Sequence, residues 1–169
     1  MNTRALTSAL LAGLIRNQVA DVNMVSAPIM IKEKGIVLSE VKRDKTGVYD
    51  GYIKLTVKTD KQTRSVAGTV FSDGKPRFIQ IKGINMDADV GANMVYISNT
   101  DVPGMIGFMG TTLGNAGVNI ANFQLGREKE AGDAIALLYV DAPVSEDVLA
   151  QLTANPAIRQ ARPLVFNVE

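Results

Sequence analysis

The residues between Asn99 and Gly107 have the types and spacing of a small polar binding site. They run Asn99-Thr100-Asp101-Val102-Pro103-Gly104-Met105-Ile106-Gly107, between an apolar strand pattern and a helical pattern. Proline is well tolerated at the start of a helix, and the free N–H groups of a helix N-terminus attract a carboxylate. Asp101 and Asn119 add groups suited to an ammonium and a hydroxyl. Together these groups predict binding, rather than conversion, of a free amino acid.

Each of these residues also has a purely structural interpretation. Asp101 can serve as a turn and capping residue before the helix, and Asn119 can close the turn that follows Gly117. The helix also carries glycines that follow a strand, as in dinucleotide-binding loops, but their spacing is not Gly-x-Gly-x-x-Gly. Close helix packing is the better interpretation of these glycines, which are Gly104, Gly107, Gly110 and Gly114.

Composition predicts a folded cytoplasmic protein. The chain has 169 residues, is 46% hydrophobic and has a net charge of +1, which suits one large or two small domains. No apolar run approaches the roughly 18 residues of a membrane span, and no secretory signal opens the chain. We therefore expect neither a membrane-bound nor a secreted protein.

The absence of two residue types excludes several chemistries. The chain has no cysteine and no histidine. Disulfides, thiolate nucleophiles, histidine-based catalysis and the commonest metal ligands are therefore excluded, and we assign no catalytic or metal-binding residue. The basic cluster Lys42-Arg43-Asp44-Lys45 is expected to be a solvated turn, because the balanced charge argues against a nucleic-acid surface.

The first half of the chain predicts helices packed on a mostly antiparallel sheet. Apolar residues recur at helical spacing over residues 3–20, and a second helix is predicted over 27–34, ended by Gly35. Alternating patterns then predict four strands, with a hairpin turn at Asp73-Gly74 between the last two. These strands span residues 36–42, 52–59, 64–71 and 77–82. The polar residues 83–91 are the best candidate for a linker.

The second half predicts the element order βαββαβ. The predicted strands span 93–98, 118–125, 134–140 and 158–166, and the predicted helices span 103–116 and 145–153. The fold class is therefore α+β, with a ferredoxin-like second domain. RNA-recognition modules share this order, but the central strands here offer chiefly Tyr96 and Tyr139 without a basic surround. We therefore expect no nucleic-acid partner.

Two motifs in this second half resemble the ACT domain. They are Asp101-Val102-Pro103-Gly104 and Gly117-Val118-Asn119-Ile120, and they occur at the spacing of that family. With Phe123-Gln124-Leu125-Gly126-Arg127, they resemble more narrowly the C-terminal ACT domain of bacterial D-3-phosphoglycerate dehydrogenases. Upstream, residues 22–28, 34–36, 68–70 and 77–83 resemble the allosteric substrate-binding domain of the longer forms. The resemblance implies domains at residues 1–88, lacking an N-terminal strand, and 89–169.

The resemblance implies a regulatory fragment that binds L-serine at an ACT dimer interface for feedback control of serine biosynthesis. Regulation would work by a shift of population between two arrangements. The chain lacks a Rossmann unit and a catalytic histidine, so it is not expected to be an enzyme or to hold a cofactor by itself. Its parent would be an NAD-dependent oxidoreductase. The expected partners are L-serine, further copies of the chain and the missing dehydrogenase domains.

The family's functional residues carry over onto named positions. Asp101 and Asn119 would hold the amino group of the effector and bridge the dimer interface. Backbone N–H groups of Gly104, Met105 and Ile106 would bind its carboxylate. The effector set is completed by Asn99 and Ile120.

An anion site in the first domain is also implied by the resemblance. Arg77 matches a basic residue associated with phosphate or substrate anions, and Lys82 is its neighbour. The segment Met86-Asp87-Ala88-Asp89 has no base where the family has a second arginine. Arg77 can equally be a solvent-facing strand residue.

Two other functions stay open at this point. The regulatory part of a bacterial L-serine dehydratase carries the same two domain types, although residues 123–127 and 162–166 fit the dehydrogenase better. The neighbouring sequence separates the two, because a cysteine-rich domain would follow in the dehydratase and a Rossmann unit would precede in the dehydrogenase. The ACT unit can also be an assembly module without a ligand.

Overall fold

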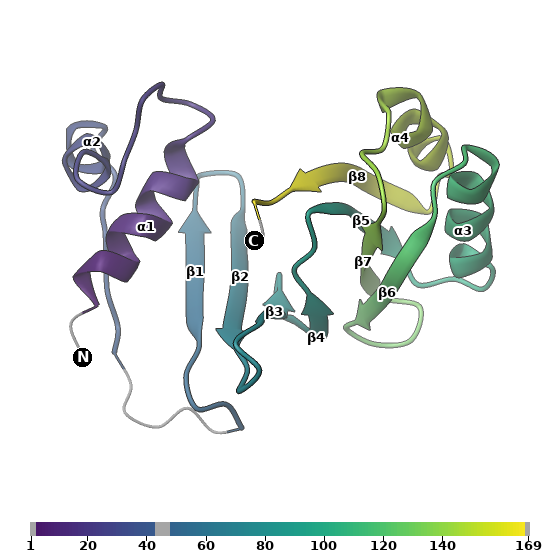
Figure 1. Ribbon diagram of the computed structural model, residues 1–169, viewed down its shortest axis with the longest axis horizontal. Helices are drawn as coiled ribbons and strands as arrows, with labels where there is room; N and C mark the ends of the chain where they lie inside the picture. The colour runs from purple at the N-terminus through teal and green to yellow at the C-terminus, as the bar shows by residue number, and fades with distance from the viewer. Residues whose placement is uncertain (1–2, 43–47, 168–169) are drawn as a thin grey trace. The chain divides into compact units, whose positions relative to one another are not determined.

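The computed structural model describes residues 3–42 and 48–167 of the chain, which form two compact units, Met1–Lys45 and Thr46–Glu169. The described residues contain four helices and two antiparallel four-stranded sheets (Figure 1). The predicted α+β class is therefore confirmed, whereas the predicted domain boundary between residues 88 and 89 stays a prediction. No helix in the described ranges has the length and apolar character that crossing a membrane requires.

The first unit is a pair of helices, α1 (Arg4–Ile15) and α2 (Ala27–Glu33). Pro28 occupies the first turn of α2, and Gly35, with a φ of 69°, follows its C-terminus as predicted. Between the helices lies a small apolar core, made of Leu11, Ala12, Ile15, Ala27 and Ile31. The helix predicted over residues 3–20 is shorter in the structure and ends at Ile15, because the chain turns after this residue.

The strand predicted over residues 36–42 is wrong. These residues form neither helix nor strand, and Val37 is 93% exposed. The alternating pattern that predicted the strand requires a neighbouring strand to accept its hydrogen bonds. The described part of this unit supplies no such strand. Of the basic cluster that begins at Lys42, residues 43–45 lie outside the described ranges.

The first sheet of the second unit is built from consecutive hairpins. Its strands are β1 (Ile53–Lys58), β2 (Thr63–Val70), β3 (Pro76–Ile81) and β4 (Ile84–Asp89), in that order. The predicted Asp73-Gly74 turn joins β2 to β3, with Gly74 at a φ of 78°. Lys82 and Gly83 alone join β3 to β4, and both have positive φ, as in the tightest hairpin turns.

The linker predicted over residues 83–91 is also wrong, because this segment contains β4. Ile84 and Ala88 are buried and alternate with more exposed polar residues, so the polar composition concealed a half-buried strand. Strand β4 lies against β6 of the second sheet at Gly126. A Cβ atom at Gly126 would lie 2.7 Å from Cγ2 of Ile84 and 2.8 Å from the carbonyl oxygen of Asn85. Glycine is thus needed where the two sheets meet.

The second sheet confirms the predicted βαββαβ order. The elements of this part of the chain are, in order, β5 (Asn93–Thr100), α3 (Met105–Asn115), β6 (Ile120–Arg127), β7 (Asp133–Val140), α4 (Glu146–Thr153) and β8 (Ile158–Val165). The strand order is β6-β7-β5-β8, and all neighbours are antiparallel. Helices α3 and α4 cover one face (Figure 1). The core between helices and sheet includes Val95, Ile97, Met109, Leu113 and Leu138.

Candidate functional site

The N-terminus of α3 is not capped by any side chain. Gly104 is the N-cap residue, with a φ of 86°, and its carbonyl accepts a hydrogen bond from the N–H of Phe108. The first N–H groups of a helix have no partner within the helix. At α4, by contrast, the Ser145 hydroxyl accepts a hydrogen bond from the N–H of Val148. The start of α3 therefore offers donors and the positive end of a helix dipole to an anion.

Asp101 lies just before this helix and is held by an arginine. Its Oδ2 accepts a hydrogen bond from Nη1 of Arg127 over 3.2 Å, and its side chain is 21% exposed. Its backbone N–H donates to the carbonyl of Gly132. Arg127 could not be assigned to this site from the sequence, because it lies 26 positions after Asp101 and only the fold, at the end of β6, brings the two side chains together.

Asn99 is a buried amide with an unsatisfied acceptor. It is 1% exposed and lies on the same face of β5 as Val95 and Ile97, under the helices. Its Nδ2 donates to the carbonyl of Thr100 over 2.8 Å, which fixes the orientation of the amide. Its Oδ1 has no partner within the described ranges. A buried unpaired acceptor costs about 1–3 kcal/mol.

The apolar residues of the predicted set have different environments. The side chain of Met105 is buried in the core, whereas Ile106 is 56% exposed. Ile120 opens β6 opposite Val140 and packs against the core. The buried side chain of Met105 is therefore not available to a ligand, and the role expected for the backbone N–H groups of Met105 and Ile106 stays a prediction.

Asn119 lies far from Asp101 within one chain. Strands β5 and β6 are both antiparallel to β7, so they run in the same direction. Thr100 pairs with Asp133 and Ile120 pairs with Val140, at opposite ends of β7. Seven residues of strand correspond to roughly 20 Å or more. A single copy therefore does not bring the side chains of Asp101 and Asn119 to one ligand.

Asn119 nevertheless has an ordered position at its own end of the sheet. Its Nδ2 donates to Oδ2 of Asp141 over 2.7 Å, and its carbonyl accepts a hydrogen bond from the N–H of Asp141. The residue is exposed, so its amide is accessible to a second molecule.

Arg77 is surrounded by acidic side chains. Its guanidinium lies 2.9 Å from Asp89, 3.4 Å from Asp73 and 3.8 Å from Asp87, and it stacks on the ring of Phe71. An anion at Arg77 would have to displace or repel these carboxylates. Within the described ranges, no acidic group of three or more side chains is placed to hold a metal ion.

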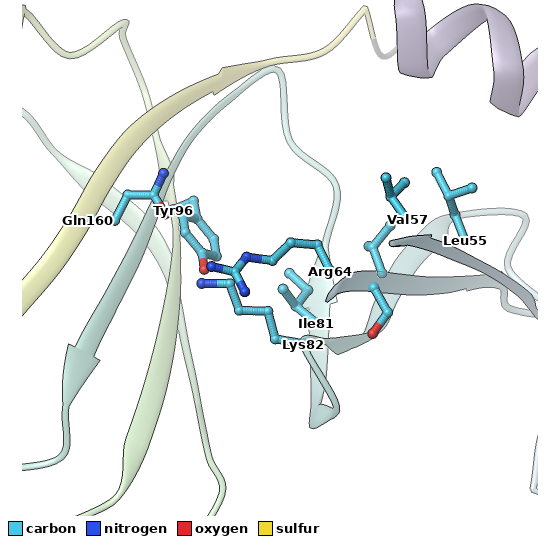
Figure 2. A pocket seen from close by; sticks show the side chains of 9 residues that line it. Leu55, Val57, Arg64, Ile81, Lys82, Tyr96 and Gln160 are labelled. Atoms are coloured by element: carbon cyan, nitrogen blue, oxygen red, sulfur yellow. The ribbon is translucent and has the colours of Figure 1, made fainter. Parts of the chain in front are cut away.

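Lys82 does not share a site with Arg77. Arg77 is near the start of β3 and Lys82 follows its end, so the strand separates them. The ammonium of Lys82 instead lies 5.4 Å from the centre of the Tyr96 ring (Figure 2). The two residues of the predicted anion site thus have different surroundings. Arg77 is neutralised by carboxylates, whereas Lys82 forms no ion pair with any residue that the structure describes.

Comparison with known proteins gives one family and several relatives. Residues 1–82 match the family described as the D-3-phosphoglycerate dehydrogenase intervening domain. The D-3-phosphoglycerate dehydrogenase of Bacillus subtilis is 35% identical over 94% of this chain and 30% of its own length. Those of Synechocystis and Methanocaldococcus jannaschii are each 32% identical, over 95% and 92% of this chain. The chain is similar to these proteins over almost all of its length and spans about 30% of theirs.

Proposed function

We propose that this chain is the C-terminal regulatory part of a D-3-phosphoglycerate dehydrogenase and that its second half is an ACT domain that binds L-serine. The similarity of nearly the whole chain to dehydrogenases of that name supports the proposal. The NAD and the catalytic residues of such an enzyme would belong to domains outside this chain.

One observation carries the choice of an amino acid as the ligand. Three kinds of group follow one another along the chain from Asn99 to the start of α3: the buried, unpaired Oδ1 of Asn99, the carboxylate of Asp101 and uncapped backbone donors. The donors suit a carboxylate, and Asp101 suits an ammonium. The Asn99 oxygen suits an N–H or O–H donor such as the serine hydroxyl.

The separation of Asp101 and Asn119 supports a site made by two copies. Helix α3 connects the two ends of the sheet, with Asp101 before it and Asn119 after it. If two copies pack their α3 helices antiparallel about a two-fold axis, Asp101 of each copy lies near Asn119 of the other. The glycines Gly107, Gly110 and Gly114 along α3 have open space where a Cβ would lie, which favours a close approach.

Serine would then act through the arrangement of the two copies. A ligand shifts an equilibrium only by the difference in its affinity for the two states. Because serine would touch both copies, it would stabilise the arrangement in which both halves of the site meet. The dehydrogenase domains attached to the pair would respond to that arrangement.

The experiment is isothermal titration of the chain with L-serine at a protein concentration that sustains a dimer, with L-alanine as the control. Saturable heat for serine, lost in Asp101→Ala and in Asn119→Ala, is the expected result. No heat from a chain shown to be folded and dimeric would overturn the proposal and leave the second half as an assembly module.

A further inference from the structure

The turn after α3 determines where Asn119 lies. Gly117 has a φ of 73°, and its N–H donates to the carbonyl of Gly114. The N–H of Val118 donates to the carbonyl of Leu113 over 2.9 Å, which completes the hydrogen-bond pattern of a Schellman motif. Asn119 is the next residue along the chain and directly precedes β6. The end of α3 and the start of β6 therefore hold its backbone on both sides.

Asp141 lies opposite Asn119, at the point where β7 ends. Ile120 pairs with Val140, and the N–H of Asp141 donates to the carbonyl of Asn119 over 3.2 Å, so the antiparallel register continues by one residue. Directly opposite residues of an antiparallel pair have their side chains on the same face and within reach of each other. The register therefore brings the carboxylate of Asp141 to the amide of Asn119, where Oδ2 and Nδ2 are 2.7 Å apart.

The carboxylate of Asp141 determines which way the amide of Asn119 is turned. An ionised carboxylate only accepts hydrogen bonds, so it must face the NH₂ group of the amide and not its oxygen. A hydrogen bond to a charged acceptor is also stronger than one between neutral groups. Oδ1 of Asn119 accepts no hydrogen bond within the ranges that the structure describes. The pair thus leaves an oxygen acceptor on Asn119 for a ligand.

Asp141 also adds a negative charge that has no cationic partner. Among the described residues, no lysine or arginine nitrogen lies within 4.0 Å of its carboxylate. Asp101, in contrast, is paired with Arg127. Asn119 and Asp141 are both exposed, so they present an acceptor beside a negative charge at this end of the sheet. Such a pair suits the ammonium of a ligand.

We propose that Asp141 is a positioning residue of the serine site, which turns Oδ1 of Asn119 toward the ammonium of the ligand. This role rests on the function proposed above, in which Asn119 of one copy completes a site with Asp101 of the other. Asp141 acts through Asn119 and does not itself need to contact serine. Without its carboxylate the amide can turn over, and Nδ2 would then face the ammonium, a donor against a donor.

Isothermal titration of the full chain with L-serine, comparing the wild type with Asp141→Asn, tests this role. The substitution keeps the size of the side chain, removes the charge and allows Asn119 to adopt both orientations. Serine binding should weaken by about fivefold to tenfold, as expected for the loss of one hydrogen bond. The melting temperature and the fraction of dimer should stay the same, because both side chains are exposed.

The exchange variant, Asn119→Asp combined with Asp141→Asn, tests the orientation itself. The new amide can donate to the new carboxylate, whose second oxygen is then left for the ligand. Serine affinity should return to within about threefold of the wild type. The matched control is Asp147→Asn, which removes an exposed carboxylate in the first turn of α4 and should leave serine binding unchanged.

The results also distinguish this role from the function on which it rests. If the wild-type chain is folded and dimeric but does not bind serine, both are overturned. If the wild type binds serine and Asp141→Asn binds it equally well, the positioning role is overturned and the proposed function stands. The same holds if the exchange variant binds no better than Asp141→Asn, or if Asp147→Asn loses as much affinity, since net charge alone would then govern binding.

Discussion

Nη1 of Arg127 lies 3.2 Å from Oδ2 of Asp101, so the carboxylate proposed to hold the ammonium of serine already has a positive partner. The arginine side chain is 55% exposed and the aspartate side chain 21% exposed. An exposed pair of this kind contributes about 0–1 kcal/mol to stability. Its larger consequence is for binding, because a ligand ammonium must share Asp101 with Arg127.

Replacing Arg127 by glutamine should therefore tighten serine binding a few-fold, since Asp101 then has no competing cation. The free energy of unfolding should change by less than about 1 kcal/mol, as expected for an exposed ion pair. Isothermal titration and urea denaturation measure the two effects. Weaker serine binding would instead mean that Arg127 holds the carboxylate of the ligand.

The substitution Asp101→Asn should weaken serine binding roughly tenfold to a hundredfold, because a hydrogen bond to a charged group is worth about 1.5–3 kcal/mol. Asp147→Asn, an exposed aspartate in the first turn of α4, is the control and should bind serine normally. If both variants kept wild-type affinity, Asp101 would be only a residue of the turn before α3.

The variant Asn99→Leu tests whether Asn99 serves serine binding or only the fold. The substitution removes a buried amide whose Oδ1 is unpaired, so the melting temperature of the free chain should stay the same or rise. The rise in melting temperature on adding serine should become smaller, because the ligand loses an acceptor. A variant that melts earlier but responds fully to serine would show that Asn99 serves the fold alone.

Gly126→Ala should destabilise the second unit by about 1–3 kcal/mol, because its Cβ would meet Ile84 and the backbone of Asn85. Gly13→Ala, in α1, is the control because nothing lies within 4 Å of its Cβ position. It should stabilise the helix by about 0.5–1 kcal/mol. Urea denaturation of both variants checks the difference, and equal effects would argue against close packing of β4 on β6.

Most of the second half was predictable from local signals. Periodic apolar residues, the Gly117 turn and the Ser145 cap mark the helices and strands that the structure contains. The two predictions that were wrong, the strand over 36–42 and the linker over 83–91, have different physical causes. The strand expected over 36–42 needed a neighbour that the described part of its own unit does not supply, and β4 was too polar to be distinguished from a linker.

The candidate site was predictable in its parts but not in its arrangement. Residue types and spacing selected Asp101 and Asn119, yet only the parallel course of β5 and β6 shows that they lie at opposite ends of the sheet. The pairing of Asp101 with Arg127 and the contact of Lys82 with Tyr96 depend on contacts between distant segments. Sequence patterns report local periodicity and do not contain such contacts.

A serine site that is built from two copies of the chain can be restored by mixing two variants that do not bind serine by themselves. Asp101→Ala and Asn119→Ala are each expected to lose serine binding. After equal amounts are mixed and allowed to exchange, half of the dimers contain one chain of each kind, and each of these has one intact site. Isothermal titration should then recover about a quarter of the wild-type sites. If mixing recovered none in a sample shown to have exchanged subunits, Asp101 and Asn119 would not meet across two copies.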